Sequence, residues 1–330
     1  MNKGIIFILI LLACSCTSEK KKEVIHEESA IAVTAPEFNA DSAYLYVKTQ
    51  CDFGPRKPGT KQHEACAEWI EKKLKQFCTT VHVQTGSVTT YTGLTLQIKN
   101  FIAQYNPSAS KRILLFAHWD TRPWADRDTI KPDEPMLGAD DAASGVGVLL
   151  ELARQLAGRE LAGGKLGVGV DIAFFDAEDY GTKKGDKDEE DSYALGTQYW
   201  CRNRVPAGYT AAYGVLLDLV GSRNAKFSLE GFSKQYAPGV MSNIWNTANR
   251  IGYGNTFIFL EGGYITDDHY YVNTLAGIPS IDIIHTDQTT GTGFPSHWHT
   301  HRDNMELIDK STLKAVGQTL LEVLFVSPGI

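Results

Sequence analysis

The chain has 330 residues, of which 43% are hydrophobic and 22% are charged, and its formal net charge is −7. This is the composition of a folded globular protein, and it excludes a disordered chain, a collagen and a coiled coil. The acidic balance argues against a nucleic-acid partner, because a phosphate backbone requires a basic face. Six cysteines are too few for a disulfide-built scaffold, so a hydrophobic core must supply the stability.

The N-terminal segment predicts an export signal followed by a tether. The apolar run from Gly4 to Ala13 follows Lys3 and is too short to span about 30 Å of hydrocarbon. Small residues and cysteines follow it, as in a bacterial lipoprotein signal whose lipidated residue is Cys14 or Cys16; a plain secretory signal is the alternative.

These features divide the chain into three parts. We expect a signal peptide at 1–16, a flexible tether at 17–37 and a single domain at 38–330. The protein is then exported and lipid-anchored in the bacterial envelope, on the periplasmic side. Since no apolar stretch is long enough for a membrane span, the lipid is the only expected membrane contact.

Several segments of the expected domain carry helix signals. Asn39 or Asp41 can cap a short helix that ends near Gln50, and residues 63–77 show apolar side chains at helical spacing. Further apolar stripes run over 146–156 and, after a cap at Asp309, over 313–324.

Continuous apolar runs between these helices predict strands that are buried on both faces, at 112–117, 170–175, 213–217 and 278–284. Buried strands that alternate with amphipathic helices indicate an α/β fold. We expect a three-layer sandwich, in which a central, mostly parallel twisted sheet has helices on both faces.

Polar residues follow the ends of these strands or lie in the loops between elements. In chain order they are His118, Asp120, Asp140, Asp141, Glu178, Asp179, Asp218, Asp267, Asp268, His269 and His299. Ligand sites of open α/β sheets lie beyond the carboxyl ends of the strands, so these side chains can converge. A single aspartate there is more often a cap or a loop anchor, but the whole set offers the nitrogen and oxygen ligands of a catalytic zinc.

Five segments, taken together, resemble the zinc aminopeptidase superfamily and specifically its glutaminyl cyclase branch, which has a zinc-exopeptidase-like fold. They run in family order and are GADDAASG from Gly138, FFDAEDYG from Phe174, LLDLVG from Leu216, TDDH from Thr266 and FPSHWHTHRDN from Phe294. The resemblance covers essentially the whole domain.

The resemblance implies a role for each matching residue. Asp141, Asp179 and His299 are the implied ligands of one zinc ion, with Asp179 standing where a glutamate is often found. Glu178 is the implied general acid and base, and Asp218 and Asp267 form a carboxylate pair beside the metal. Trp298 and Phe294 line the substrate pocket. Another pocket tryptophan that often follows the acidic pair is missing here, and Tyr193 is a candidate substitute.

The implied reaction converts the N-terminal glutamine of peptides and proteins to pyroglutamate with release of ammonia. One alternative is a two-zinc aminopeptidase, because His118 and Asp218 can hold a second metal together with Asp141. A non-catalytic peptide-binding module is a third reading. A serine hydrolase is disfavoured, because the chain has no G-x-S-x-G elbow.

Overall fold

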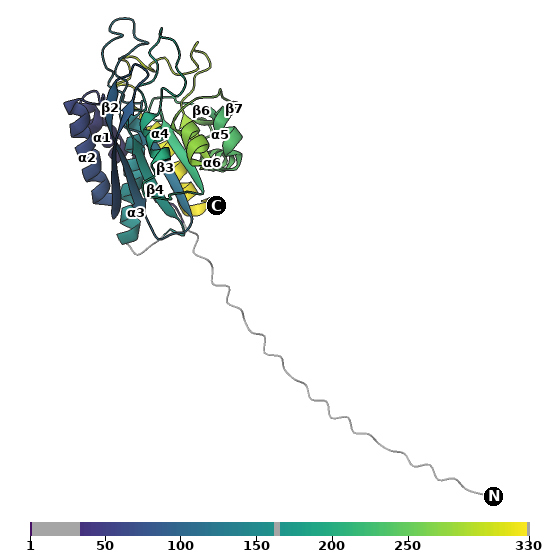
Figure 1. Cartoon of the computed structure of the whole chain (residues 1–330). Coiled ribbons are helices and arrows are strands. Elements are labelled where there is room, and N and C mark those ends of the chain that lie inside the picture. The colour runs from purple at the N-terminus through teal and green to yellow at the C-terminus, as the bar shows by residue number, and fades with distance from the viewer. Residues whose placement is uncertain (2–33, 162–165, 329–330) are drawn as a thin grey trace. The chain divides into compact units, whose positions relative to one another are not determined.

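A mixed sheet forms the centre of the protein, as a computed structural model describes it for Met1 and residues 34–161 and 166–328 (Figure 1). The strand order is β1-β2-β4-β3-β5-β8, where the strands are β1 (Thr80–Thr89), β2 (Thr95–Tyr105), β3 (Arg112–His118), β4 (Gly169–Phe175), β5 (Tyr213–Asp218) and β8 (Ser280–Ile284). β3 pairs in parallel with β4 and β5, and β5 pairs in parallel with β8. β2 pairs antiparallel with β1 and with β4, so it alone among the six strands has the opposite direction. The expectation of a mostly parallel sheet is therefore confirmed.

The two faces of the sheet pack against different helices, because side chains alternate along a strand. Ile113 and Leu115 of β3 face one core, whereas Leu114 and Phe116 face another. The first core is closed by α1 (Ala40–Asp52), α2 (Lys61–Phe77), α3 (Ala143–Leu161), α6 (Pro238–Arg250) and α8 (Lys310–Val326). The second is closed by α4 (Leu195–Arg202) and the π-helix η1 (Val272–Ala276). The three-layer α/β sandwich is therefore confirmed.

Helix caps fix where several helices begin. The side chain of Asn39 accepts a hydrogen bond from the Ser42 amide at the start of α1, and Asp309 accepts one from the Ser311 amide at the start of α8. Both caps match the sequence prediction for these two helices.

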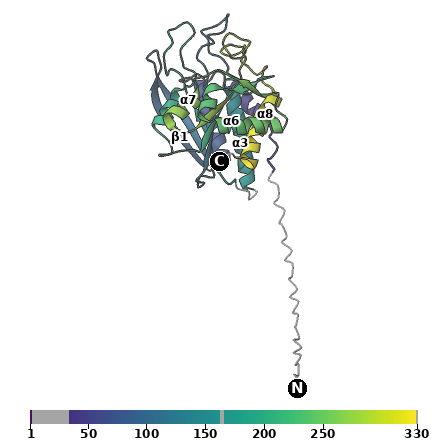
Figure 2. The ribbon, with the colours of Figure 1, turned by 90° about the vertical axis from the view of Figure 1, so that its right-hand side faces the viewer.

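Smaller elements complete the fold beside the sheet (Figures 1 and 2). A parallel pair, β6 (Phe227–Leu229) and β7 (Phe257–Glu261), lies near the short helices α5 (Gly231–Tyr236) and α7 (Asp268–Tyr271). These elements were not predicted from the sequence, and neither were β1, β2 and α4.

Two further expectations concern the membrane and the cysteines. Within the described ranges, every helix is too short or too polar to cross a bilayer. The expected signal peptide and most of the tether lie outside the described residues. Cys51, Cys66, Cys78 and Cys201 are buried. Among the described residues, Cys51, Cys66 and Cys201 form no disulfide, and burial raises the pKa of the Cys51 thiol to about 11.

Candidate active site

The connections that leave the carboxyl ends of the central strands bring the predicted site residues together. β3 ends at His118, β5 ends at Asp218, and the segment after β4 carries Glu178 and Asp179. The loop before α3 adds Asp141, and the long connection between β8 and α8 adds His299. Figure 1 shows coil connections gathered at this end of the sheet. All six side chains are buried, at 7% exposure or less.

Asp141, Asp179 and His299 form the first set of possible metal ligands, with one ligand atom of each within 4.8 Å of the others. His299 Nε2 lies 3.3 Å from Asp179 Oδ1 and 3.8 Å from Asp141 Oδ2. Two carboxylates and one imidazole are a donor set that zinc accepts, and three protein ligands leave a fourth position open. The three residues that the resemblance implied as ligands therefore meet at one point.

A second set shares Asp141 with the first and adds His118 and Asp218. His118 Nε2 lies 3.1 Å from Asp141 Oδ1 and 3.5 Å from Asp218 Oδ1, while Nδ1 faces Asp120. Burial acts to lower the pKa of His118, but the surrounding carboxylates of Asp120, Asp141 and Asp218 outweigh it and raise that pKa well above its usual range. The carboxylates around His118 therefore attract positive charge, either a proton or a cation.

Some buried oxygen atoms of these sets have no hydrogen-bond partner in the part of the chain that the structure describes. They are Oδ2 of Asp179 and Oδ1 of Asp218. A buried carboxylate oxygen without a partner is costly, because its desolvation is not compensated. A divalent cation bound at either set would satisfy the unpartnered oxygen of that set, so the residues present fit a metal ion.

Arg122 and Asp126 hold the first set in place, and the sequence analysis did not identify either. The Arg122 guanidinium donates to both oxygens of Asp126 and, through Nη1, to Asp179 Oδ1 at 3.1 Å. Asp126 Oδ1 also lies 3.5 Å from Nδ1 of His299. Such contacts orient metal ligands and fix the tautomer of an imidazole. The signal in the sequence is weak, since a charged pair four residues apart in a loop is common.

Two buried aspartates fix the backbone of the ligand loops. The Asp120 carboxylate accepts the amide protons of Glu178 and Asp179, at 3.0 and 3.3 Å. Asp303 does the same for Asp140 and Asp141, at 2.7 and 3.1 Å. Three of these four amides belong to predicted site residues, and the fourth, of Asp140, directly precedes Asp141. Asp120 and Asp303 therefore fix the positions of the loops that carry the site residues.

Glu178 has a buried carboxyl group whose pKa suits proton transfer. Its side chain is buried and lines the same cavity as Asp141, Asp179 and His299. Burial raises the pKa of Glu178 well above its usual range, and the negative charges of Asp267 and Asp179 raise it further. A carboxyl group whose pKa is shifted toward neutrality can both accept and donate a proton near pH 7. Asp179 is the opposite case, because His299 and Arg122 outweigh burial and lower its pKa.

Asp218 and Asp267 line the same cavity, and burial raises the pKa of both. The charge of Asp141 raises the pKa of Asp218 further, and Asp267 adds to the effect. The carboxylate of Asp267 accepts the Asp268 amide at 2.5 Å, which caps α7. The two carboxyls thus share one cavity, as the predicted pair requires, and their mutual repulsion favours a proton on one of them.

Aromatic side chains form one wall of the cavity, which has a volume of about 340 Å³. The rings of Phe294 and Trp298 stack at 4.2 Å, and Trp298 stacks on His299 at 3.7 Å. Tyr193, the candidate substitute for the missing tryptophan, also lines the cavity and donates to the Thr182 carbonyl oxygen. A partly apolar cavity wall thus lies directly beside the possible metal ligands.

Two residues of the site have a backbone conformation that side chains rarely adopt. Ala177 has φ 52° and His299 has φ 56°, both in the left-handed region. Residues in this region persist where the surrounding structure holds them, and they occur often at active sites. The Ala177 carbonyl accepts the Leu195 amide, and the His299 carbonyl accepts the Arg127 amide.

Comparisons with known proteins show what this chain is similar to. The model of peptidase family M28 matches residues 100–324. A glutaminyl cyclase from Bacteroides thetaiotaomicron, solved with N-acetylhistamine, is 50% identical and covers 88% of this chain and 99% of its own, with a TM-score of 0.85. A protein described as a leucine aminopeptidase precursor from the same species is also 50% identical, covers 89% of this chain and 99% of its own, and has a TM-score of 0.84. The glutaminyl-peptide cyclotransferase of Bothrops jararaca is 24% identical over 80% of this chain and 75% of its own length.

Proposed function

The chain belongs to peptidase family M28, and from this membership and the site we infer that it is a glutaminyl cyclase. It converts the N-terminal glutamine of peptides and proteins to pyroglutamate and releases ammonia. The observation that carries this inference is the position of Glu178, a buried carboxyl group in a cavity shared with Asp141, Asp179, His299 and Trp298.

We propose that Asp141, Asp179 and His299 hold one zinc ion. The orphaned Oδ2 of Asp179 and the nitrogen-and-oxygen donor set support this assignment. Bound there, the ion would supply Lewis-acid polarisation of the substrate's γ-carbonyl group. Arg122 keeps one oxygen of Asp179 engaged, so the ligand set is held before an ion enters.

Glu178 serves as the proton shuttle. The substrate's α-amine must lose a proton when it attacks the γ-carbonyl carbon, and the departing amide nitrogen must gain one to leave as ammonia. A single carboxyl group can accept the first proton and return it, so that no net proton is consumed. The raised pKa of Glu178 suits both halves of this cycle.

Asp218 and Asp267 bind the reacting nitrogen atoms. With one proton between them, the pair offers both a hydrogen-bond donor and an acceptor to the α-amine and the leaving group. Trp298 and Phe294 pack against the flat amide of the glutamine side chain and hold it in a bent conformation. Because the attack is intramolecular, this positioning supplies much of the rate enhancement.

A two-zinc aminopeptidase is the second candidate function, and the shared position of Asp141 between two ligand sets favours it. Hydrolysis requires water between two metals about 3.5–4 Å apart, whereas cyclisation requires one metal and exclusion of water. The stacked Phe294 and Trp298 beside His299 support the cyclase. The third reading, a non-catalytic peptide-binding module, leaves the raised pKa of Glu178 without a role.

One experiment separates these functions. The purified protein is assayed on a Gln-initiated peptide and on a leucine arylamide, with and without a chelator, while elemental analysis gives zinc per chain. The cyclase predicts ammonia release from the Gln peptide, one zinc ion and no arylamide hydrolysis. Arylamide hydrolysis with two zinc ions supports the aminopeptidase, and inactivity on both substrates in a zinc-loaded protein contradicts both enzymes.

We further propose that the single catalytic domain at 38–330 is exported and held in the bacterial envelope, on the periplasmic side, by a lipid on Cys14 or Cys16. Both cysteines lie outside the described residues, and the support is the order of charge, apolar run and small residues in the sequence. Metabolic labelling with a fatty acid, in the parent and in Cys14→Ala and Cys16→Ala variants, tests the anchor. Labelling that survives in the double variant contradicts it.

A further inference from the structure

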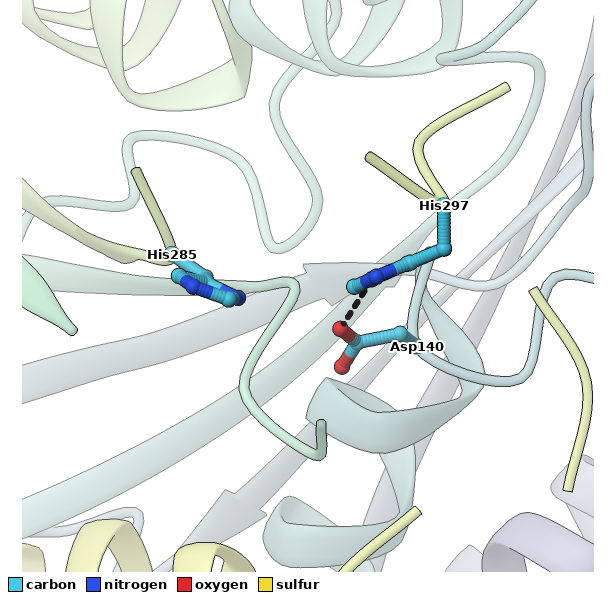
Figure 3. A group of neighbouring side chains, drawn as sticks. All are labelled: Asp140, His285 and His297. Atoms are coloured by element: carbon cyan, nitrogen blue, oxygen red, sulfur yellow. Dashed lines mark hydrogen bonds and ion pairs between the residues drawn. The ribbon is translucent and has the colours of Figure 1, made fainter. Parts of the chain in front are cut away.

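A third group of possible metal ligands lies beside the active site but outside it. Asp140, His285 and His297 each place one ligand atom within 4.8 Å of the others. Figure 3 shows both imidazoles directed toward the space beside the Asp140 carboxylate. We call this group the Asp140 site. The function proposed above uses none of its three side chains.

The hydrogen bonds of Asp140 leave its carboxylate directed at the two histidines. Oδ1 accepts the Gly221 amide at 2.6 Å, and Oδ2 pairs with His297 Nε2 at 2.9 Å. The residue has no exposed surface. One oxygen therefore fixes the side chain to the backbone, and the other faces the imidazole of His297.

The surroundings of His285 favour an uncharged imidazole with one nitrogen free to bind a metal ion. Its Nδ1 lies 2.9 Å from the Ser222 hydroxyl, and an Nδ1–H that donates to this oxygen leaves Nε2 as the free lone pair. Metal-binding histidines commonly donate their other ring nitrogen in this way. Burial lowers the pKa of His285 to about 4, which keeps the ring uncharged at neutral pH.

The two histidines of the Asp140 site, but not Asp140 itself, line a cavity of their own. His285 and His297 line a pocket of about 540 Å³ together with Ser222, Asp287 and Arg302. None of its lining residues belongs to the cavity that contains Glu178 and Trp298. A cation and its remaining water ligands thus have a route to the Asp140 site that does not pass through the substrate pocket.

We propose that Asp140, His285 and His297 bind a divalent transition-metal cation of the zinc class, separately from the catalytic metal. Two imidazoles and one carboxylate are the ligand set of open zinc sites, with the fourth position left to water from the cavity. The ion takes the place of the hydrogen now shared between His297 Nε2 and Asp140 Oδ2.

We expect the Asp140 site to bind a cation weakly, because its side chains must rearrange around the ion. Ligand atoms around a tetrahedral zinc lie about 3.3 Å apart, because each bond is roughly 2.0–2.1 Å long. In the Asp140 site, Asp140 Oδ2 and His297 Nε2 lie 2.9 Å apart, whereas the ring centroids of His285 and His297 lie 6.1 Å apart. The side chains must therefore close around the ion, which costs affinity.

The position of the Asp140 site couples it to the active site. Asp140 directly precedes Asp141, and His297 is two residues before His299. A cation that holds Asp140 and His297 together ties the two loops that carry these catalytic ligands. Occupancy therefore stabilises the folded protein against heat without adding a group to the reaction.

Calorimetric titration of the zinc-loaded full chain with ZnCl2, up to about 1 mM, tests the proposal beside thermal unfolding. The parent should show one additional weak binding event and a zinc-dependent rise in Tm. His285→Asn should lose both, and should retain the cyclisation rate at low zinc. The control His82→Asn changes a half-buried histidine of β1 and should retain both. An additional event that persists in His285→Asn, or that is missing in the parent, overturns the proposal.

A second measurement covers the case in which His285→Asn does not fold. Crystals of the parent protein are soaked in ZnCl2 and measured at the zinc absorption edge. An anomalous peak between Asp140, His285 and His297 supports the site. A peak at His299 with none at the Asp140 site contradicts it and leaves the proposed catalytic function intact.

Discussion

β3 and β4 carry buried charged side chains at both of their ends, and the two ends differ in how those charges are satisfied. At the first end, Arg112 donates through Nε and Nη2 to the two oxygens of Asp171, at 2.7 and 2.6 Å. Gln104 adds a donor to one oxygen and Tyr209 adds one to the other. At the other end, the carboxylates beyond the strands face a cavity, and oxygens of Asp179 and Asp218 lack a hydrogen-bond partner among the described residues.

This difference distinguishes a buried ion pair that only stabilises the fold from buried carboxylates that can bind a ligand. A buried ion pair whose donors and acceptors are all matched has no capacity left for a ligand. A group of buried carboxylates with unmatched oxygens costs folding free energy, which a bound cation or a substrate recovers. Charged side chains are buried at both ends, so the unmatched atoms are the informative observation.

The largest effect is expected from Glu178→Gln, which tests the functional end. The variant keeps the shape of the side chain but cannot transfer a proton, so kcat on a Gln-initiated peptide should fall by about 10²–10⁴-fold. Zinc content should stay at the parent level, because Glu178 is not among the proposed ligands. Glu190→Gln, in the exposed acidic loop, is the matched control and should leave kcat unchanged. A Glu178→Gln enzyme with near-parent kcat contradicts the shuttle assignment.

Asp171→Ala tests the structural end. It leaves the Arg112 guanidinium buried without its carboxylate, so the free energy of unfolding should fall by about 3–5 kcal/mol in urea titrations. The kcat of the folded enzyme should not change, since Asp171 lies at the end of β4 opposite to the site residues. The double variant Arg112→Met, Asp171→Leu should recover much of the loss. Equal destabilisation in the single and double variants would argue against an unpaired charge as the cause.

The sequence predicted the strands that are buried on both faces more accurately than the edge of the sheet. The expected runs at 112–117, 170–175 and 213–217 lie within one residue of β3, β4 and β5. Double-sided burial requires an unbroken apolar run, which is easy to recognise. β1 is half exposed and mixes polar and apolar residues without strict alternation, so the sequence gives no comparable signal for it.

Some residues of the site could likewise be predicted from the sequence, and others could not. Asp141, Asp179 and His299 stand in recognisable motifs at strand ends or loop ends, and the structure brings them together. Arg122 and Asp126, which hold Asp179 and His299, follow no pattern that separates them from surface charges. The contact between Asp140 and His297 joins residues that are far apart in the chain, and only the tertiary fold reveals it.

Glu230 offers another buried carboxylate whose two oxygens both accept hydrogen bonds, as those of Asp171 do. Burial acts to raise the pKa of Glu230, but hydrogen bonds from His269 and Ser233 outweigh it and hold the pKa at about 2, against an ordinary value of 4.5. A lowered pKa in the folded state stabilises the protein above pH 4.5, and the contribution, about 3 kcal/mol, is lost as the pH falls toward 2.

Urea titrations of the parent and of Glu230→Gln between pH 7 and pH 3 measure this contribution. The parent should be more stable at pH 7, and the difference between the two proteins should narrow as the pH falls. A constant difference over the whole range would show that the ionisation of Glu230 does not stabilise the fold.

The smallest effect is expected from Arg122→Lys. Arg122 is fully engaged in hydrogen bonds, and it supports Asp179 at the end of the sheet where carboxylate oxygens lack partners. Lysine keeps the positive charge but lacks the planar fork that joins Asp126 to Asp179. Zinc affinity should fall by about 10–100-fold, because a ligand that loses its orienting contact binds more weakly. Competition with a chromophoric chelator measures the affinity, and kcat at saturating zinc should change much less. Arg223→Lys, at an exposed arginine, is the control. Unchanged zinc affinity in Arg122→Lys would mean that Asp179 is positioned by its backbone, through the amide contact with Asp120, rather than by the guanidinium.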